Sequence, residues 1–462
     1  WAQGHRCPAA SRPPALAMVC RSRGGSPCRG RSGEGAATCR GDDAWLLEPT
    51  SWEDGPLPLT AAWITSSLRA GGALARGDEV ASLRFDPLHV RRGEGDRLRR
   101  VLLRGSSSSV PASIYVKTLE PHEAAFYAHV APLLQGVRTP RVLYRGASLL
   151  VLEDVDGRRW EEPDPVCSEG AFSPRGGASL ASAYARLHAA SWANAELASQ
   201  AAVEGRSLAR DLLARREWQR VASQPWIREA LSAAASAGAV GGLCRCFCLA
   251  VAEQWRVCEA ALGRAACVVH GDPHGGNALD VSAGSSGARP PCLLDFEFAA
   301  FDHPAWDLAL LVFQLWPSHW ARSPARSCES VAAVYCEELG KCGVEAYGAD
   351  ACVADLGIAV PLCFAAFLLT RTAETFEEWW RDGPPAGQPP GSDQRAPAPE
   401  ASWIEEALAG PESEGLLARL PPAVVASYHA EVDRHAEAPD GQECINLQHH
   451  PSWAGSFTEV QF

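Results

Sequence analysis

The chain has 462 residues and a net charge of −13 at pH 7, with 47% hydrophobic and 21% charged residues. This balance is typical of a soluble globular protein that is long enough to bury a sizeable core. The acidic charge argues against a nucleic-acid-binding surface. The 17 cysteines are odd in number and scattered, which argues against a disulfide framework and for a reducing compartment.

The first 50 residues lack a core-forming pattern. Residues 1–40 contain seven Arg and one acidic residue, Glu34, among Gly, Ser, Pro and Ala. This composition fits an organellar transit peptide, and it fits a disordered or artefactual segment equally well. We therefore expect a cytoplasmic protein, or an organellar one if residues 1–40 are a transit peptide.

Residues 57–154 predict a small β-rich domain. A helical pattern is followed by strand patterns at 80–85, 98–103 and 113–117, by a second helix, and by two strands near residues 142 and 150. The strand at 113–117 ends on Lys117, and Glu123 starts the helical pattern after it, which implies a very short connection.

Lysine usage singles out Lys117. Only two of the 42 basic residues are lysines, Lys117 and Lys341, so the coding bias disfavours this residue type. Lysine is a compact point charge that Arg does not replace without cost. A strand lysine that binds phosphate and is oriented by a helix glutamate such as Glu123 is a kinase feature. The alternative is a lysine whose ammonium group reaches water at a strand end.

Residues 155–380 predict a mainly helical domain interrupted by two short strands. The apolar run 356–369 is shorter than the ~20 residues that a membrane helix needs and contains Pro361, so we expect a buried helix. Cys244, Cys246 and Cys248 lack the spacing of zinc sites and are interpreted as small buried apolar residues. Residues 381–400 form a Pro-rich segment predicted to be disordered, and residues 401–462 form terminal helices and a tail.

Two short motifs carry the chemistry. Asp272 and Asn277 lie in the loop His270–Asn277 after an apolar run, and Asp295 follows a second apolar run. This layout is typical of a phosphoryl-transfer site, where one carboxylate accepts the proton of an attacking hydroxyl. An amide oxygen and a second carboxylate are suitable Mg²⁺ ligands beside nucleotide phosphates. An ordinary surface loop is the alternative, because Gly, Pro, Asn and Asp are also turn residues.

Taken together, the segments resemble those of the aminoglycoside phosphotransferase and choline kinase superfamily, and most of all its ecdysteroid-kinase-like (CHK kinase-like) branch. The resemblance covers about residues 57–375. Besides the two catalytic motifs, it rests on segments in the family's order: Leu59–Ile64, Ser113–Lys117, Glu123–Tyr127, Leu150–Asp154, Leu187–Trp192 and Pro304–Ala309.

The resemblance implies an α+β, two-lobed protein-kinase-like fold, with a small β-rich N-lobe (57–154) and a larger, mainly helical C-lobe (155–380). It also implies phosphorylation of a small molecule's hydroxyl group, with ATP and Mg²⁺ as cofactors. The implied roles are a catalytic base at Asp272, metal ligands at Asn277 and Asp295, a phosphate contact at Lys117 paired with Glu123, and adenine contacts near Glu153 and Asp154. Gly93 and Gly95 are the only candidates for a phosphate loop, and a plain hairpin turn fits them about as well.

Two other functions are compatible with this fold. The alternative to an enzyme is a catalytically inactive nucleotide-binding module with a kinase fold. The four polar residues of the expected site are all present, however: Lys117, Asp272, Asn277 and Asp295. A protein kinase is disfavoured because the loop reads His270-Gly271-Asp272 where protein kinases have His-Arg-Asp. Expected partners are ATP and a small hydroxyl-bearing substrate, with no nucleic acid and no membrane.

Overall fold

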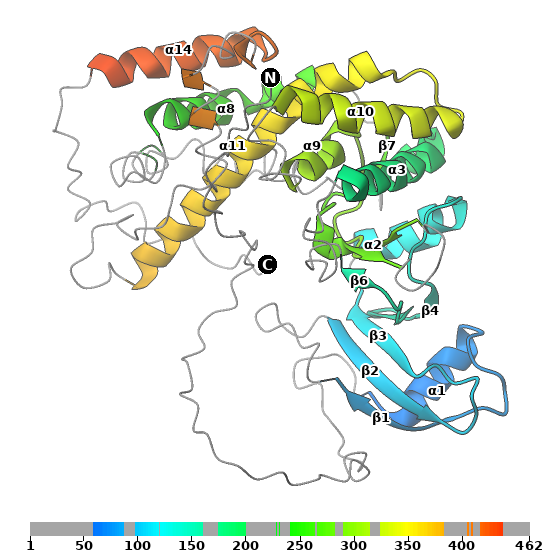
Figure 1. Cartoon of the computed structure of the whole chain (residues 1–462). Coiled ribbons are helices and arrows are strands. Elements are labelled where there is room, and N and C mark those ends of the chain that lie inside the picture. Colours follow the sequence, from blue (N-terminus) through cyan, green and yellow to red (C-terminus); the bar gives the residue numbers. More distant parts are fainter. Residues whose placement is uncertain are drawn as a thin grey trace, which may run out of the picture. The chain divides into compact units, whose positions relative to one another are not determined.

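The computed structural model describes most of the chain between residues 59 and 437. The described residues are 59–86, 98–119, 121–159, 174–199, 241–263, 266–281, 290–314, 324–382 and 416–437, with 228, 231, 404, 405, 408 and 409. The chain divides into two compact units, residues 1–119 with 141–154 and residues 120–140 with 155–462 (Figure 1). Residues 1–50, Gly93, Gly95 and all but the first two residues of the predicted Pro-rich segment lie outside the described residues.

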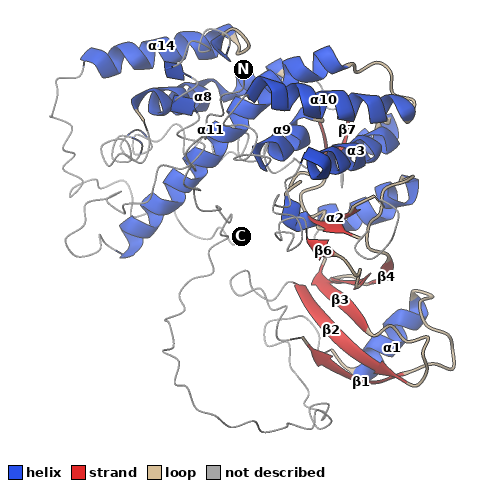
Figure 2. Ribbon diagram, viewed as in Figure 1, coloured by secondary structure: helices blue, strands red, loops and turns tan. Residues whose placement is uncertain are grey.

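The first unit is built on a five-stranded antiparallel sheet (Figure 2). Its strand order is β1-β2-β3-β5-β4. The strands are β1 (Val80–Phe85), β2 (Leu98–Gly105), β3 (Ser113–Thr118), β4 (Val142–Arg145) and β5 (Leu149–Glu153). The five predicted strands are therefore confirmed, and β3, which carries Lys117, is the central strand.

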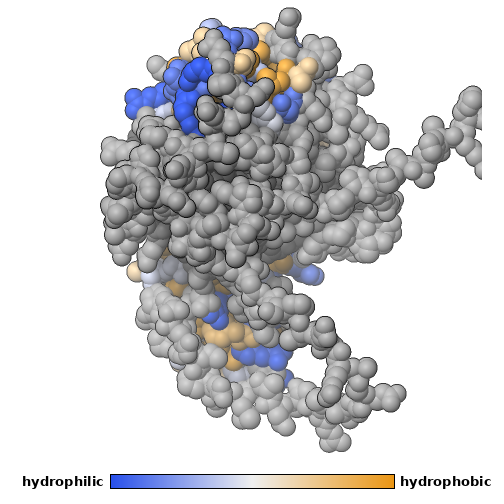
Figure 3. All heavy atoms as spheres, turned by 90° about the vertical axis from the view of Figure 1, so that its left-hand side faces the viewer, coloured by the Kyte–Doolittle hydropathy of each residue, from blue (hydrophilic) through white to orange (hydrophobic). Residues whose placement is uncertain are grey.

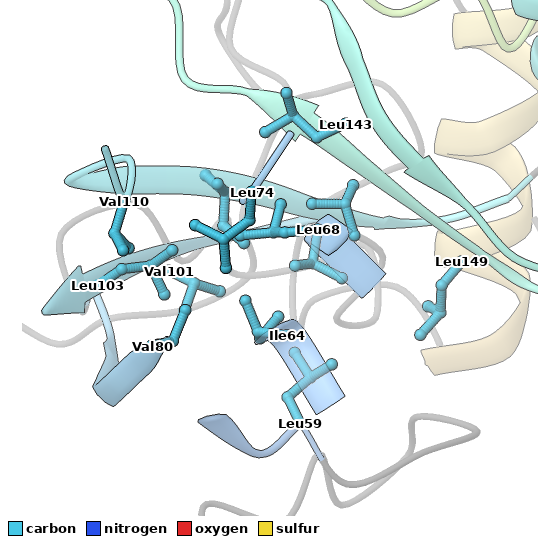
Figure 4. Close-up of a cluster of buried hydrophobic side chains, with 13 residues drawn as sticks. Leu59, Ile64, Leu68, Leu74, Val80, Val101, Leu103, Val110, Leu143 and Leu149 are labelled. Carbon is cyan, nitrogen blue, oxygen red and sulfur yellow. The ribbon is translucent and has the colours of Figure 1, made fainter. Parts of the chain in front are cut away.

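Helix α1 (Ala61–Ala70) covers this sheet. The hydroxyl of Thr60 caps its first turn by accepting a hydrogen bond from the backbone N–H of Trp63 at 3.1 Å. Ile64 and Leu68 of α1 pack with sheet residues such as Val101 into a cluster of thirteen buried side chains (Figure 4). This burial of apolar surface is the main stabilising interaction of the unit.

The second unit is mainly helical, which confirms the predicted α+β fold class. After α2 (Pro121–Ala125) the chain continues into a π-helix, Phe126–Val130, and a short 3₁₀ turn. The later helices are α3 (Pro174–Ser191), α4 (Ala195–Ser199), α8 (Gly242–Ala261), α9 (Ala305–Gln314), α10 (Pro324–Lys341), α11 (Ala349–Asp382) and α14 (Pro422–Glu437). Helix α3 packs on α10, α9 packs on α11, and α8 packs on α14.

Two small sheets interrupt these helices. One pairs β7 (Cys267–Val269) with β10 (Ala300–Asp302), and the other has the order β6 (Arg158–Arg159), β8 (Ala278–Asp280), β9 (Cys292–Leu293). Both predicted catalytic motifs emerge from these short strands, the first after β7 and the second after β9. The strands fix the ends of loops whose interiors are rich in turn residues.

The interior of the second unit is densely apolar. Cys244, Cys246 and Cys248 are buried free thiols on α8, as the apolar interpretation predicted. The stretch Ala349–Ala366 of α11 has the length and hydropathy of a membrane span, but 61% of it is buried inside the protein. It contains Pro361 and packs against α9 and α10, so it is a core helix of this unit.

Two large hydrophobic side chains are exposed among the described residues, Leu133 and Val257. Figure 3 shows hydrophilic side chains mixed with a smaller apolar group at the top of the view, where α14 lies in Figure 1. Scattered apolar residues of this kind are normal on a protein surface.

The core of the first unit provides a stability test. Leu68→Ala should lower the free energy of unfolding by about 2–4 kcal/mol, because it leaves a cavity where a fully buried side chain packed. The matched control is Leu133→Ala, the same change at a side chain that is 43% exposed, which should have little effect. Urea denaturation of both variants measures the difference, and equal midpoints would contradict the assignment of this core.

Candidate active site

The carboxylate of Asp307 holds the loop that follows β7. Asp307 lies in the first turn of α9 and is fully buried. It accepts hydrogen bonds from the backbone N–H of His270 at 2.6 Å and of Gly271 at 3.0 Å. A carboxylate that accepts hydrogen bonds from two backbone N–H groups fixes the path of the chain through His270 and Gly271.

A third donor to the same carboxylate comes from α3. The Nε2 of His188 lies 3.1 Å from Asp307 Oδ2, and its Nδ1 lies 2.9 Å from the hydroxyl of Tyr335 on α10. Because a carboxylate only accepts, Nε2 carries a proton and donates to Asp307. All three side chains are fully buried, so this network joins three helices to the loop.

Gly271 occupies a position that no other residue type fits. Its φ is +85°, in the region that glycine adopts without steric cost. A Cβ at this position would lie 2.1 Å from the carbonyl oxygen of Phe298. The glycine therefore allows two backbone segments to approach closely, immediately before Asp272.

The side chain of Asp272 is oriented by its own loop. Its Oδ2 accepts a hydrogen bond from Asn277 Nδ2 at 3.1 Å and lies 3.4 Å from His274 Nε2. Its other oxygen, Oδ1, has no hydrogen bond within the described residues. The side chain is 23% exposed, so one oriented carboxylate oxygen remains open to a ligand.

Asn277 links the two predicted motifs. Its Nδ2 also donates to the backbone carbonyl of Asp272 at 3.0 Å, which ties it to the first motif. Its own backbone carbonyl accepts a hydrogen bond from the N–H of Leu294 at 2.8 Å. This bond continues the pairing of β8 with β9, in which Ala278 lies opposite Leu293. Asn277 therefore lies beside Leu294, the residue that immediately precedes Asp295.

The backbone of Asp295 is strained. Its φ is +60°, and within the described ranges only Ala193 shares a positive φ without being a glycine. Such conformations cost on the order of 1–3 kcal/mol and persist where the surrounding structure holds them. Aspartate tolerates this region better than most residues do. The positive φ identifies Asp295 as a position whose backbone conformation is held by the surrounding structure.

Aromatic packing ties the helix of Glu123 to the second motif. The ring of Phe296 stacks on Phe126, with centroids 3.6 Å apart and planes 9° apart, and its centroid lies 4.7 Å from that of His270. Glu123 lies one turn before Phe126 and is fully buried. Residues 120–140, which the sequence analysis assigned to the N-lobe, therefore cluster with the second unit.

The remaining predicted nucleotide contacts lie in the first unit. Lys117 is only 5% exposed on β3, opposite Leu98 of β2 and Leu150 of β5. Asp154 accepts hydrogen bonds from Arg100 at 2.7 Å and from Ser113, so its carboxylate belongs to an ion-pair cluster within this unit.

Glu153 is the last residue of β5 and pairs with the central strand β3. Its backbone N–H donates to the carbonyl of Arg141 at 2.9 Å, and its side chain accepts from Arg141 N–H at 3.2 Å. The structure thus separates the predicted residues into two sets. Asp272, Asn277, Asp295 and Glu123 belong to the second unit, and Lys117, Glu153 and Asp154 belong to the first.

Residues 81–347 match the phosphotransferase enzyme family, and this match spans more than half of the 462 residues. The chain belongs to this family. The match contains every described candidate residue and both small sheets. No curated protein matches the chain.

Several solved structures are similar to this phosphotransferase. The macrolide 2'-phosphotransferase of Brachybacterium faecium is 18% identical, with 76% of this chain and 99% of that chain covered and a TM-score of 0.38. A choline/ethanolamine kinase family protein of Mesorhizobium loti is 16% identical, with 78% and 98% covered and a TM-score of 0.40. A GDP and kanamycin complex of an aminoglycoside phosphotransferase is 17% identical, with 70% and 95% covered and a TM-score of 0.41. The chain is assigned to its family by the match over residues 81–347 and not by these structures.

The residues of this phosphotransferase fit a hard cation better than a transition metal. Within the described residues, no group of three or more His, Cys, Asp and Glu side chains is arranged to hold a metal ion. Mg²⁺ needs only one or two protein carboxylates, because phosphate oxygens and water complete its shell. Both side-chain hydrogen bonds of Asn277 use Nδ2, which leaves Oδ1 available as an oxygen ligand for a metal ion. This donor chemistry fits Mg²⁺.

Sequence reasoning did not find the role of His188. It is a fully buried residue of α3 that connects Asp307 to Tyr335. The available signal was a histidine within an apolar helical stretch, together with the acidic residue that starts α9. Neither pattern says that the two side chains meet, because they are 119 positions apart in the chain.

The Asp307 network provides a second test. In Asp307→Asn, one of the three donors must face an amide NH₂ group that cannot accept a hydrogen bond. We expect the free energy of unfolding to fall by about 2–4 kcal/mol, because a buried N–H loses its charged partner. The control is Asp350→Asn, the same change at an exposed residue in the first turn of α11. Similar denaturation curves for both variants would show that Asp307 does not hold the loop.

Proposed function

We propose that this protein is a kinase that transfers the γ-phosphoryl group of ATP to a hydroxyl group of a small molecule, with Mg²⁺ as cofactor. The observation that carries the proposal is the oriented, partly exposed carboxylate of Asp272, which is hydrogen-bonded to Asn277, the residue whose strand pairing places it beside Leu294, just before Asp295. Membership of the phosphotransferase enzyme family supports the reaction type. The four polar residues that this chemistry needs, Lys117, Asp272, Asn277 and Asp295, are all present among the described residues. Their presence favours an enzyme over an inactive module.

Asp272 is the proposed general base. Its Oδ2 is fixed by Asn277, while Oδ1 has no hydrogen bond within the described part of the chain. A base must reach the proton that it removes, and partial exposure gives an acceptor hydroxyl access to Oδ1. The acceptor oxygen forms a bond to the γ-phosphorus, its proton passes to Asp272, and the bond from the γ-phosphorus to the bridging oxygen breaks to release ADP.

Asn277 and Asp295 are the proposed metal ligands, and Lys117 is the proposed phosphate contact, oriented by Glu123. A bound Mg²⁺ would supply charge neutralisation at the phosphate oxygens. The protein's own part is to hold the ligands in place. The strand pairing fixes Asn277 beside the residue before Asp295, and Phe296, the residue after it, is held by its stack on Phe126.

Within the family we propose the CHK kinase-like branch. The segments Leu187–Trp192 and Pro304–Ala309 support this placement, since they supply His188 and Asp307, the two side chains that organise the loop. A cytoplasmic location is proposed with it, or an organellar one if residues 1–40 are a transit peptide.

The reaction is tested by ADP release from ATP in the presence of a library of hydroxyl compounds, with and without EDTA. We expect Asp272→Ala to lower turnover of the best acceptor by about 10²–10⁴-fold, the range for loss of a general base, with little change in ATP affinity. Glu329→Ala, at an exposed carboxylate on α10, serves as the control. Nucleotide binding without turnover of any compound would favour the inactive module instead.

Lys117 provides a further test, for which the chain supplies its own control. Lys117→Arg should lower turnover by on the order of 10²-fold, because the larger planar guanidinium misplaces the charge at a buried site by about 1 Å. Lys341→Arg should be silent, since Lys341 is 59% exposed at the end of α10 and pairs with Glu337 and Glu338. Circular dichroism checks that both variants fold, and equal activity would refute the role of Lys117.

A further inference from the structure

Three histidines of the second unit close the same kind of local turn. In each, the ring Nδ1 accepts a hydrogen bond from the backbone N–H two residues further along the chain, at 3.3 Å for His270, 3.0 Å for His274 and 3.3 Å for His303. Asparagine and aspartate side chains commonly form turns of this kind. Because a backbone N–H only donates, Nδ1 carries no proton in these rings, and each neutral imidazole has its proton on Nε2.

The Nε2–H groups of the three rings have different partners. That of His270 lies 2.7 Å from a backbone carbonyl oxygen, and that of His303 lies 3.5 Å from Oδ2 of Asp355 on α11. The Nε2 of His274 lies 3.4 Å from Oδ2 of Asp272. His274 is therefore the one of the three whose donor faces the carboxylate of the proposed base.

The carboxylate of Asp272 has two donors beside the same oxygen. Asn277 Nδ2 lies 3.1 Å from Oδ2, and His274 Nε2 lies 3.4 Å from it. The histidine contact is longer than an ordinary N–H···O bond, so it is mainly the attraction between an N–H dipole and a negative charge. Catalytic contacts that are long in a free enzyme often shorten in the substrate complex. A second donor beside Oδ2 restricts rotation of the carboxylate about its Cβ–Cγ bond, which one donor alone would allow.

The turn by itself does not account for a histidine at position 274. Closing the turn needs only an acceptor for the N–H of Gly276, and asparagine would provide one. Core packing does not account for it either, because the side chain is 25% exposed. What the imidazole adds to an asparagine is a donor at the far side of the ring, and that donor faces Asp272.

We infer that His274 is a positioning residue for Asp272, an inference that rests on the proposed function. Its Nε2–H and the Nδ2 of Asn277 together hold Oδ2, so that Oδ1 keeps one direction towards the acceptor hydroxyl. The turn to Gly276 fixes the tautomer that makes Nε2 a donor. His274 transfers no proton in this role and contacts no reacting atom other than the carboxylate of the base.

Two substitutions separate the two contacts of the ring. His274→Asn keeps an acceptor for Gly276 N–H and lacks a donor that reaches Asp272, whereas His274→Gln keeps an amide N–H at the reach of Nε2 and lacks the acceptor. We expect His274→Asn to lower kcat for the best acceptor by about tenfold with an unchanged KM for ATP, a part of the ~10²-fold that a misplacement of 1 Å can cost. His274→Gln should retain most of the turnover. His303→Asn, the same change in the same kind of turn beside Asp355, is the control and should leave kcat unchanged.

The comparison of the two variants can contradict the inference. Circular dichroism and thermal melting first check that both fold. An unchanged kcat in His274→Asn, or a loss in His274→Gln that is as large as or larger than the loss in His274→Asn, would show that the ring only closes its turn.

A measurement that needs no turnover separates this inference from the proposed function. In a chain labelled with ¹⁵N-histidine, the ring signals lost in His274→Asn belong to His274. They should show the Nε2–H tautomer, and they should shift in Asp272→Ala but not in Asp350→Asn. A ring protonated on Nδ1, or one that Asp272→Ala does not affect, would overturn the inference even in an active kinase. If no compound is phosphorylated, the proposed function fails, and the ring signals alone decide whether His274 holds Asp272.

Discussion

The buried carboxylate of Asp307 is the interaction on which the candidate site depends. Removing a carboxylate from water costs several kcal/mol unless hydrogen bonds replace its hydration. Here three donors do so, two of them backbone N–H groups of the loop His270–Asn277 and one the ring of His188. The loop takes its path because its N–H groups compensate this charge, and helices α3, α9 and α10 are joined at the same point.

A second constraint is steric. Gly271 lets the loop approach the backbone at Phe298, and Phe296 fills the space between His270 and the helix of Glu123. The imidazole of His270 remains neutral because burial lowers its pKa. Its Nε2 donates to the carbonyl of Leu294, and its Nδ1 accepts from Asp272 N–H. This one ring therefore connects the two motifs and orients the residue that precedes Asp295.

The sequence predicted the local part of this arrangement well. Strands such as β1 and β7 follow from short apolar runs bounded by turn residues, and the polar residues at their ends follow from the same pattern. Contacts between distant segments could not be predicted in this way. Asp307 and His270 are 37 positions apart, and helical periodicity shows only that His188 lies on a buried face. The clustering of residues 120–140 with the second unit depends on the stack of Phe126 on Phe296, which chain order does not reveal.

Asn277 shows why the proposed chemistry needs an amide at one position. Its Nδ2 donates to both the carbonyl and the carboxylate of Asp272, and in the proposed role its Oδ1 binds Mg²⁺. An aspartate there would be a stronger metal ligand, but it would lose both donors and place two carboxylates within hydrogen-bond distance. Like charges so close would raise the pKa of one of them, and a protonated Asp272 could not act as a base. In the proposed mechanism the amide therefore orients Asp272 through its Nδ2, while its oxygen remains available to the metal.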